Sequence, residues 1–232
     1  LADSTYKNDY PTIAIFNSML LKEYFENNHY HFAHSFAFDP VLNDGLRNAL
    51  EKIPEQVRKK KQILVYGRPG TERNAFNLVV AALKKWVFMQ PDIEEWEILS
   101  AGEMHRTVAL GNGKELTSVG KLSIEEYANM LEESYAGISL MCSPHPSYPP
   151  LEMSVFDVKT ITNTYANKDL KDFNENIISL DNISPMNIAK HLVEICKSYQ
   201  TEVRHIAANP LYVKNDHVFD FVEDIKKILD EE

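Results

Sequence analysis

Apolar positions along the chain follow two alternating patterns. Short, compact apolar runs are typical of buried strands, whereas apolar residues that recur every three or four positions indicate helices with one buried face. The two patterns alternate from about residue 62 to residue 200, which favours a parallel sheet covered by helices on both faces, the doubly wound α/β class with a Rossmann-like sheet. They predict strands at 62–66, 96–99, 136–141, 158–162 and 176–180, and helices at 74–89 and from residues 123, 149 and 184.

Residues that favour helix starts and turns interrupt this alternation. Ser123 and Glu126 match a capping box, and Ser184-Pro185 supplies a preferred cap followed by a proline suited to a first helical turn. Residues 111–113, Gly-Asn-Gly, lie between two apolar runs and predict a hairpin turn rather than a phosphate-binding loop. The glycine motifs GxxxxGK[ST] and GxGxxG are both missing from the sequence.

The two ends of the chain carry elements of their own. A predicted strand at 13–16 precedes a helix capped at Asn17-Ser18, and Asp39-Pro40 marks a linker because proline restricts the residue before it. An amphipathic helix is predicted at about 216–229. We therefore divide the chain into residues 1–40, which end in the linker, residues 41–210, one Rossmann-like domain, and residues 211–232, the closing helix.

Charge and cysteine content narrow the class of partner and the compartment. The chain has 34 Asp and Glu against 24 Lys and Arg, a net charge of −10 at pH 7, which opposes nucleic acid as a partner. Cys142 and Cys196 lie in apolar stretches and are interpreted as buried thiols in a reducing compartment. The basic run 58–61 is interpreted as a solvated helix end or a turn before a strand, in preference to a polyanion site. Since Leu1 follows neither an initiator Met nor a signal segment, we expect part of a longer, cytoplasmic protein.

Candidate chemistry lies in four loops that follow predicted strands, because ligands of doubly wound sheets bind beyond the carboxyl ends of the strands. Arg68 and Arg73 lie between a strand and a helix start, where guanidinium groups and free backbone N–H groups can neutralise a diphosphate. The alternative is a pair of surface arginines bound to the acidic excess. The four loops span residues 67–73, 100–103, 120–121 and 142–152.

The last of these loops has the most unusual composition, with several prolines around His145 and ahead of Glu152. Such a loop is expected to be rigid, and rigid polar loops often serve a site. Glu152 could accept hydrogen bonds from sugar hydroxyls, or it could be a first-turn carboxylate that stabilises the helix dipole. His145 could likewise be a hydrogen-bond donor within the loop, without any chemistry.

Other catalytic classes lack support in the sequence. His29, His31 and His34 lie close together, but neither a fourth ligand nor a cysteine pair accompanies them, so we expect no metal and no other cofactor. GxSxG and HExxH motifs are missing too, which leaves hydrolase chemistry unsupported.

The runs at 66–69, 73–74, 139–152 and 160–163 resemble the C-terminal half of a GT-B glycosyltransferase, over about residues 62–199. They resemble most closely the family-four-type rhamnosyltransferases that build bacterial cell-surface glycans. Where the family has two glutamates eight residues apart, this chain has Pro144 and Glu152. The resemblance implies a nucleotide-sugar donor, dTDP- or UDP-linked, with Arg68 and Arg73 at its diphosphate and residues 120–122 beside its base. The candidate substrate-binding residues are Arg68, Arg73, Asn74, Gly120, Lys121, Leu122, His145, Ser147, Tyr148 and Glu152.

The same resemblance implies transfer of a sugar, rhamnose from dTDP-rhamnose, to a cell-surface polysaccharide. Residues 1–40 would end a largely missing acceptor domain, which would bind the glycan acceptor, and residues 211–232 would cross back toward it. The piece alone would bind donor but hardly turn over, and peripheral membrane association of the full-length protein stays open. The alternative is a non-catalytic α/β module that binds a nucleotide or a protein, consistent with Pro144. A purely structural domain would leave the loop around His145 without a purpose.

Overall fold

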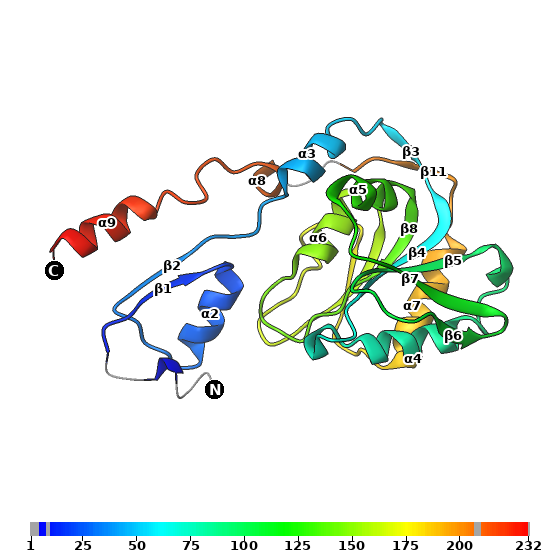
Figure 1. Ribbon diagram of the computed structural model, residues 1–232, viewed down its shortest axis with the longest axis horizontal. Coiled ribbons are helices and arrows are strands. Elements are labelled where there is room, and N and C mark those ends of the chain that lie inside the picture. Colours follow the sequence, from blue (N-terminus) through cyan, green and yellow to red (C-terminus); the bar gives the residue numbers. More distant parts are fainter. Residues whose placement is uncertain (1–4, 8–9, 207–209, 232) are drawn as a thin grey trace.

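The computed structural model describes residues 5–7, 10–206 and 210–231, and Figure 1 shows a main α/β domain with a smaller lobe beside it. The strands of the main sheet are β4 (Lys60–Gly67), β5 (Glu97–Gly102), β6 (Val108–Gly111), β7 (Lys114–Gly120), β8 (Ser134–Ile138), β9 (Lys159–Asn163) and β10 (Ile177–Leu180). Their order is β10-β9-β8-β4-β5-β7-β6, and every neighbouring pair is parallel except the β6–β7 hairpin. The predicted doubly wound sheet is therefore confirmed.

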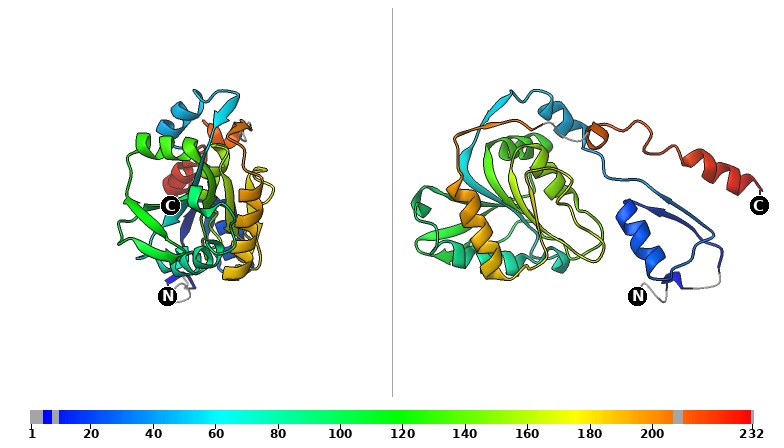
Figure 2. Two further views of the ribbon diagram at one scale, coloured as in Figure 1. Left: turned by 90° about the vertical axis from the view of Figure 1, so that its right-hand side faces the viewer. Right: turned by 180° about the vertical axis from the view of Figure 1, so that it is seen from behind.

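Helices cover both faces of this sheet, as Figure 2 shows from two further sides. They are α3 (Asp44–Leu50), α4 (Phe76–Trp86), α5 (Ile124–Glu133), α6 (Tyr148–Val155) and α7 (Pro185–Lys197), with short 3-10 turns at Glu72–Asn74 and Ile93–Glu95. Because side chains of a strand alternate between faces, Ile63 and Val65 of β4 pack under α4 and α7. Leu64 packs on the opposite face, in the core formed with α3, α5 and α6.

Local sequence signals account for where these elements begin and turn. The Ser123 hydroxyl accepts the Glu126 N–H at 3.2 Å, and the Glu126 carboxylate accepts the Ser123 N–H at 2.8 Å, so the predicted capping box is formed. Ser184 caps α7 as predicted. In the β6–β7 turn, Asn112 and Gly113 both have positive φ, the conformation of a two-residue hairpin that these residue types favour.

The smaller lobe contains the parallel pair β1 (Ile13–Phe16) and β2 (His34–Ala37), with α2 (Met19–Asn27) between them. Ser18 caps α2 by accepting the Leu21 N–H at 3.0 Å, as predicted. The chain returns to this lobe through α8 (Pro210–Val213) and α9 (Val222–Glu231), where Phe221 stacks on Phe36 at a centroid distance of 5.5 Å. The predicted start of the last helix near residue 216 was wrong, because successive turns carry residues 217–221 past Phe36 and Phe38.

Two interpretations of the sequence need correction, and both concern burial. Lys59 is not solvated: it is 1% exposed, and its ammonium donates to the backbone carbonyls of Leu131 at 3.0 Å and Phe156 at 2.6 Å. These carbonyls lie at the last turns of α5 and α6, so the cation ties two helix ends together. Cys196 is buried as expected, whereas Cys142 is only partly buried.

The elements that were not predicted include α3, α8 and the antiparallel pair β3 (Gln56–Arg58) and β11 (Glu202–Arg204). The pair joins segments that lie far apart in the chain. In the part of the chain that the structure describes, no helix has the length and apolar character needed to cross a membrane.

Candidate functional site

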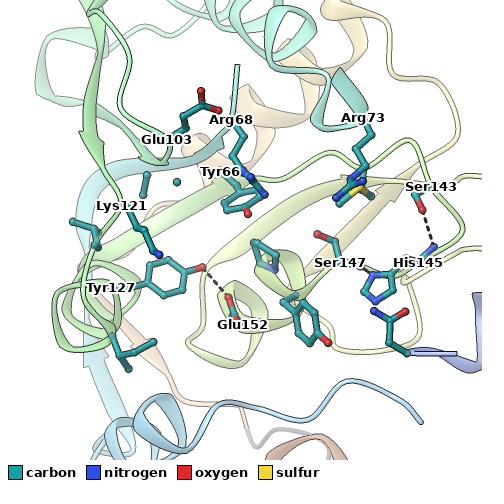
Figure 3. Close-up of a pocket in the computed structure, with 18 of the residues that line it drawn as sticks. Tyr66, Arg68, Arg73, Glu103, Lys121, Tyr127, Ser143, His145, Ser147 and Glu152 are labelled. Carbon is teal, nitrogen blue, oxygen red and sulfur yellow. Dashed lines mark hydrogen bonds between the residues drawn. The ribbon is translucent and has the colours of Figure 1, made fainter. Parts of the chain in front are cut away.

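A cavity of about 840 Å³ opens at the carboxyl ends of the sheet strands. All four loops singled out in the sequence contribute to its wall, together with α2 of the smaller lobe. Figure 3 shows how the side chains of these loops surround the opening. Of the predicted site residues, those that line the cavity are Arg68, Arg73, Lys121, Leu122, His145, Ser147, Tyr148 and Glu152.

The two other predicted residues lie behind this wall. Asn74 is 1% exposed, and its side-chain amide donates to the Leu140 carbonyl at 3.3 Å, so it supports the end of a neighbouring strand. Gly120 is buried, with a φ of +71°, and a Cβ there would come within 2.7 Å of the Met104 side chain. The positive φ favours glycine where β7 turns toward Lys121, and glycine offers no side chain to a ligand.

The loop that carries the two arginines is fixed from both sides. β4 and β5 end in close contact because Gly67 lacks a Cβ, which would lie 1.9 Å from the Ser100 hydroxyl. The Glu103 carboxylate accepts the Gly70 N–H at 3.0 Å, and the Arg73 carbonyl accepts the Cys142 N–H at 2.7 Å. The backbone beneath Arg68 and Arg73 is thus held by two neighbouring loops.

The basic side chains that line the cavity have no ion-pair partners among the described residues. Among the residues that the structure describes, none of Arg68, Arg73 and Lys121 forms an ion pair with a carboxylate, although Arg47 and Lys60 elsewhere do. Arg73 and Lys121 are exposed and Arg68 is half-buried. Neither arginine is therefore bound to an acidic side chain within the described residues. In a chain with a net charge of −10, three unpaired cations at one cavity are suited to an anionic ligand.

Glu152 occupies the opposite wall, below α5. The sequence suggested that Glu152 lies in the first turn of its helix. Since α6 begins at Tyr148, Glu152 lies one residue beyond that turn. The Tyr127 hydroxyl donates to its carboxylate at 3.1 Å, as the dashed line in Figure 3 marks. Burial raises the pKa of Glu152 to about 7, while the hydrogen bond from Tyr127 acts in the opposite direction. A buried carboxyl group held this way can accept hydrogen bonds from ligand hydroxyls.

The proline-rich loop is organised around His145. Its Nδ1 accepts the Ser147 N–H at 2.9 Å, and its own backbone N–H donates to the Ser143 hydroxyl at 3.2 Å. Ser147 has a φ of +70°, a left-handed conformation that non-glycine residues rarely adopt. Burial, helped by the charges of Lys168 and Arg73, lowers the pKa of His145, which favours the neutral ring.

Several residues of the wall were missed in the sequence. Tyr66 was attributed to a strand, Tyr127 falls within the helix predicted from residue 123, and Asn17 was considered only as part of a helix cap. Glu103 is the last residue of the loop at 100–103, one of the four loops singled out in the sequence. That position was the one signal that could have identified it as a wall residue. As for metals, the described ranges contain no group of three or more His, Cys, Asp or Glu side chains that could hold an ion.

Comparisons with known proteins agree with this fold. A family model described as the C-terminal domain of WsaF matches residues 61–193. The O-antigen biosynthesis protein RfbC of Myxococcus xanthus is 35% identical over 127 residues, which are 54% of this chain and 10% of that protein. This chain thus corresponds to about a tenth of that curated relative's length.

Solved structures are similar in fold at low sequence identity. Sucrose-phosphate synthase from Thermosynechococcus elongatus aligns with a TM-score of 0.56 and 11% identity, over 95% of this chain and 59% of that chain. A mutant of S. aureus TarM, solved with fondaparinux, alpha-GlcNAc-glycerol and UDP, aligns with a TM-score of 0.60 and 11% identity, over 79% of this chain and 36% of that chain. WaaG, a glycosyltransferase involved in lipopolysaccharide biosynthesis, aligns with a TM-score of 0.57 and 9% identity, over 84% of this chain and 56% of that chain. The resemblance to the C-terminal half of GT-B glycosyltransferases is therefore confirmed.

Proposed function

The chain belongs to the family of WsaF C-terminal domains, and from this membership we propose that it is the donor-binding domain of a glycosyltransferase of polysaccharide biosynthesis. Its ligand would be a nucleotide sugar, bound in the cavity at the carboxyl ends of the strands. The similarity to RfbC, an O-antigen biosynthesis protein, supports a cell-surface polysaccharide as the product. The finer proposal is rhamnose as the transferred sugar, carried by dTDP.

One observation carries this proposal: the cations of the cavity have no carboxylate partners within the described part of the chain. A diphosphate would supply the missing negative charge. As the glycosidic bond to the donor breaks, charge develops on the leaving diphosphate, and preorganised guanidinium groups stabilise it. Arg68 and Arg73 would do this from one wall, with Lys121 facing them.

The other walls would recognise the rest of the donor. Glu152, steadied by Tyr127, would accept hydrogen bonds from ribose or sugar hydroxyls. Residues 120–122 would border the base. No residue is assigned as the catalytic base, and Pro144, buried where the family has a glutamate, removes one contact expected at the sugar.

The acceptor side would lie toward the smaller lobe. Asn17, just before α2, and Leu21, within it, line the cavity beside the loop that carries His145. We propose that further parts of the full-length protein complete this side and hold the glycan acceptor, so that the present chain binds donor with little turnover. A cytoplasmic location follows from the need for nucleotide sugars, and peripheral membrane attachment through those parts belongs to the same proposal.

Calorimetric titration with dTDP, dTDP-rhamnose, UDP and GDP, with and without magnesium, tests the proposal. Binding of one of them should weaken more than tenfold in Arg68→Ala, because an arginine that contacts phosphate loses a charge-assisted hydrogen bond. Arg47→Ala is the matched control, since Arg47 lies on α3 and pairs with Asp44 at 2.9 Å. Equal affinity in both variants would contradict the role of Arg68.

The alternative is a binding module without catalysis, which Pro144 favours. If that module binds a protein, none of the four nucleotides would bind, and a protein partner would be recovered with the chain instead.

A further inference from the structure

Two lysines of the described part of the chain are almost completely buried, Lys59 at 1% and Lys168 at 0% exposure. A buried ammonium group is costly unless other groups compensate its charge. Lys59 has two carbonyl partners, and Asp157 and Glu132 attract its charge. Lys168 donates one hydrogen bond, to the Met141 carbonyl at 2.6 Å, and it forms no ion pair within the described residues. Its charge therefore lacks a compensating carboxylate.

The contacts of Lys168 lead directly to the cavity. It lies in the turn between β9 and β10, where its backbone pairs with Tyr165. Its partner Met141 lines the cavity, and Asn163 clamps the same residue, accepting its N–H at 2.8 Å and donating to its carbonyl at 3.2 Å. Lys168 and Asn163 thus hold the start of the proline-rich loop from behind.

The same segment supports an arginine of the opposite loop. Cys142, directly after Met141, donates its N–H to the Arg73 carbonyl at 2.7 Å. A shift of Met141 would therefore move the backbone beneath Arg73. The charge of Lys168 also reaches the wall, because it contributes to the lowered pKa of His145. An anion in the cavity would be the countercharge that this lysine lacks.

We propose that Lys168 is a positioning residue that holds Met141 and Cys142 behind the diphosphate site and adds a buried positive charge to it. This inference rests on the proposed binding of a nucleotide diphosphate, and it concerns a residue outside the cavity wall. Its action is indirect, through the loop backbone and through the electric field.

Protonation of Lys168 gives this role a distinct signature. Burial lowers its pKa to about 8, and the neighbouring Cys142 acts in the opposite direction. Other charged or titratable groups nearby are His145 and Arg73 on the cavity side and Glu23 of α2, which accepts a long hydrogen bond from Asn167. A bound diphosphate would raise the pKa of Lys168, so binding would take up a proton. Affinity should then fall as the pH rises through 8.

The experiment measures UDP and dTDP binding by calorimetry at pH 7, 8 and 9, in buffers of different ionisation enthalpy. We expect Lys168→Met to weaken binding at pH 7 about tenfold and to remove both the decline above pH 8 and the proton uptake. Lys168→Arg should bind as the natural chain does at pH 7, without the decline, since arginine does not titrate there. Lys59→Met is the matched control, because Lys59 precedes β4 at the end remote from the cavity, and it should leave the pH profile unchanged.

The possible results distinguish the role of Lys168 from the proposed binding of a nucleotide diphosphate. A decline above pH 8 that persists in Lys168→Met would overturn the inference while leaving donor binding intact. If that variant does not fold, as a thermal melt would show, a decline that persists in Lys168→Arg would overturn it equally. Failure of the natural chain to bind either nucleotide would instead refute the proposed function.

Discussion

Replacing Glu152 by glutamine should make this protein more stable at neutral and alkaline pH, although the carboxyl group belongs to the candidate site. Burial raises the pKa of Glu152 from 4.5 to about 7 in the folded chain. The fold therefore favours the neutral carboxyl group, and it carries a cost once that group ionises. Glutamine has nearly the same shape, cannot ionise, and can still accept the Tyr127 hydroxyl.

The size and sign of the effect follow from the two pKa values. A folded-state pKa raised above the unfolded value contributes stability that is fully present below pH 4.5 and is lost as the pH rises to 7. The rise of about 2.5 units, at about 1.4 kcal/mol per unit, corresponds to about 3 kcal/mol. Below pH 4.5 the two proteins should be equally stable, and above pH 7 Glu152→Gln should lead by up to this amount.

Urea unfolding at pH 5 and pH 8, followed by the fluorescence of the buried Trp86 and Trp96, measures the difference. Glu126→Gln is a control of opposite sign, because hydrogen bonds from Ser123 lower the pKa of Glu126. That variant should lose stability at pH 8 relative to the natural chain. If the difference in free energy of unfolding between the natural chain and Glu152→Gln is the same at both pH values, the carboxyl group does not titrate as reasoned.

Two further substitutions test the local geometry by urea unfolding. Ser147→Gly should stabilise the fold by about 1 kcal/mol, because it relieves a positive φ at a non-glycine residue; a loss of stability would show that the serine side chain contributes more than the strain costs. Ser123→Ala should destabilise it by about 1 kcal/mol through loss of the capping box on α5, and an unchanged midpoint would mean that the cap adds nothing.

Sequence reasoning recovered the elements whose signals are local. Ser18, Ser123 and Ser184 each sit one residue before a helix, and their side chains cap it as expected. The apolar runs identified every strand of the parallel part of the main sheet, although not its exact bounds. By contrast β3 and β11 are three residues long and pair across the chain, so neither carries a pattern of its own.

In the candidate site, too, local features could be predicted from the sequence, and contacts between distant segments could not. Its loops were predictable because parallel strands bring their carboxyl ends to one edge of a sheet. The roles of individual residues within the site depend on contacts between distant segments. Tyr127 meets Glu152 across 25 positions and Lys168 meets Met141 across 27, and a lysine in a polar turn gives no sign of being buried. The burial of Lys59 was misjudged for the same reason.

The edges of the sheets bear on how copies of this chain would behave in concentrated solution. The main sheet ends on β10 and β6, each only four residues long, which leaves few free backbone groups for pairing with another molecule. Within the described residues, the β1–β2 sheet has no neighbour on either side, and Ile15 in β1 is 54% exposed. Because β1 and β2 are also four residues long, the feature that favours aggregation at the smaller lobe is the exposed apolar side chain of Ile15 on a strand with a free edge. A charged residue at position 15 would be the first change to try when preparing samples for crystallisation.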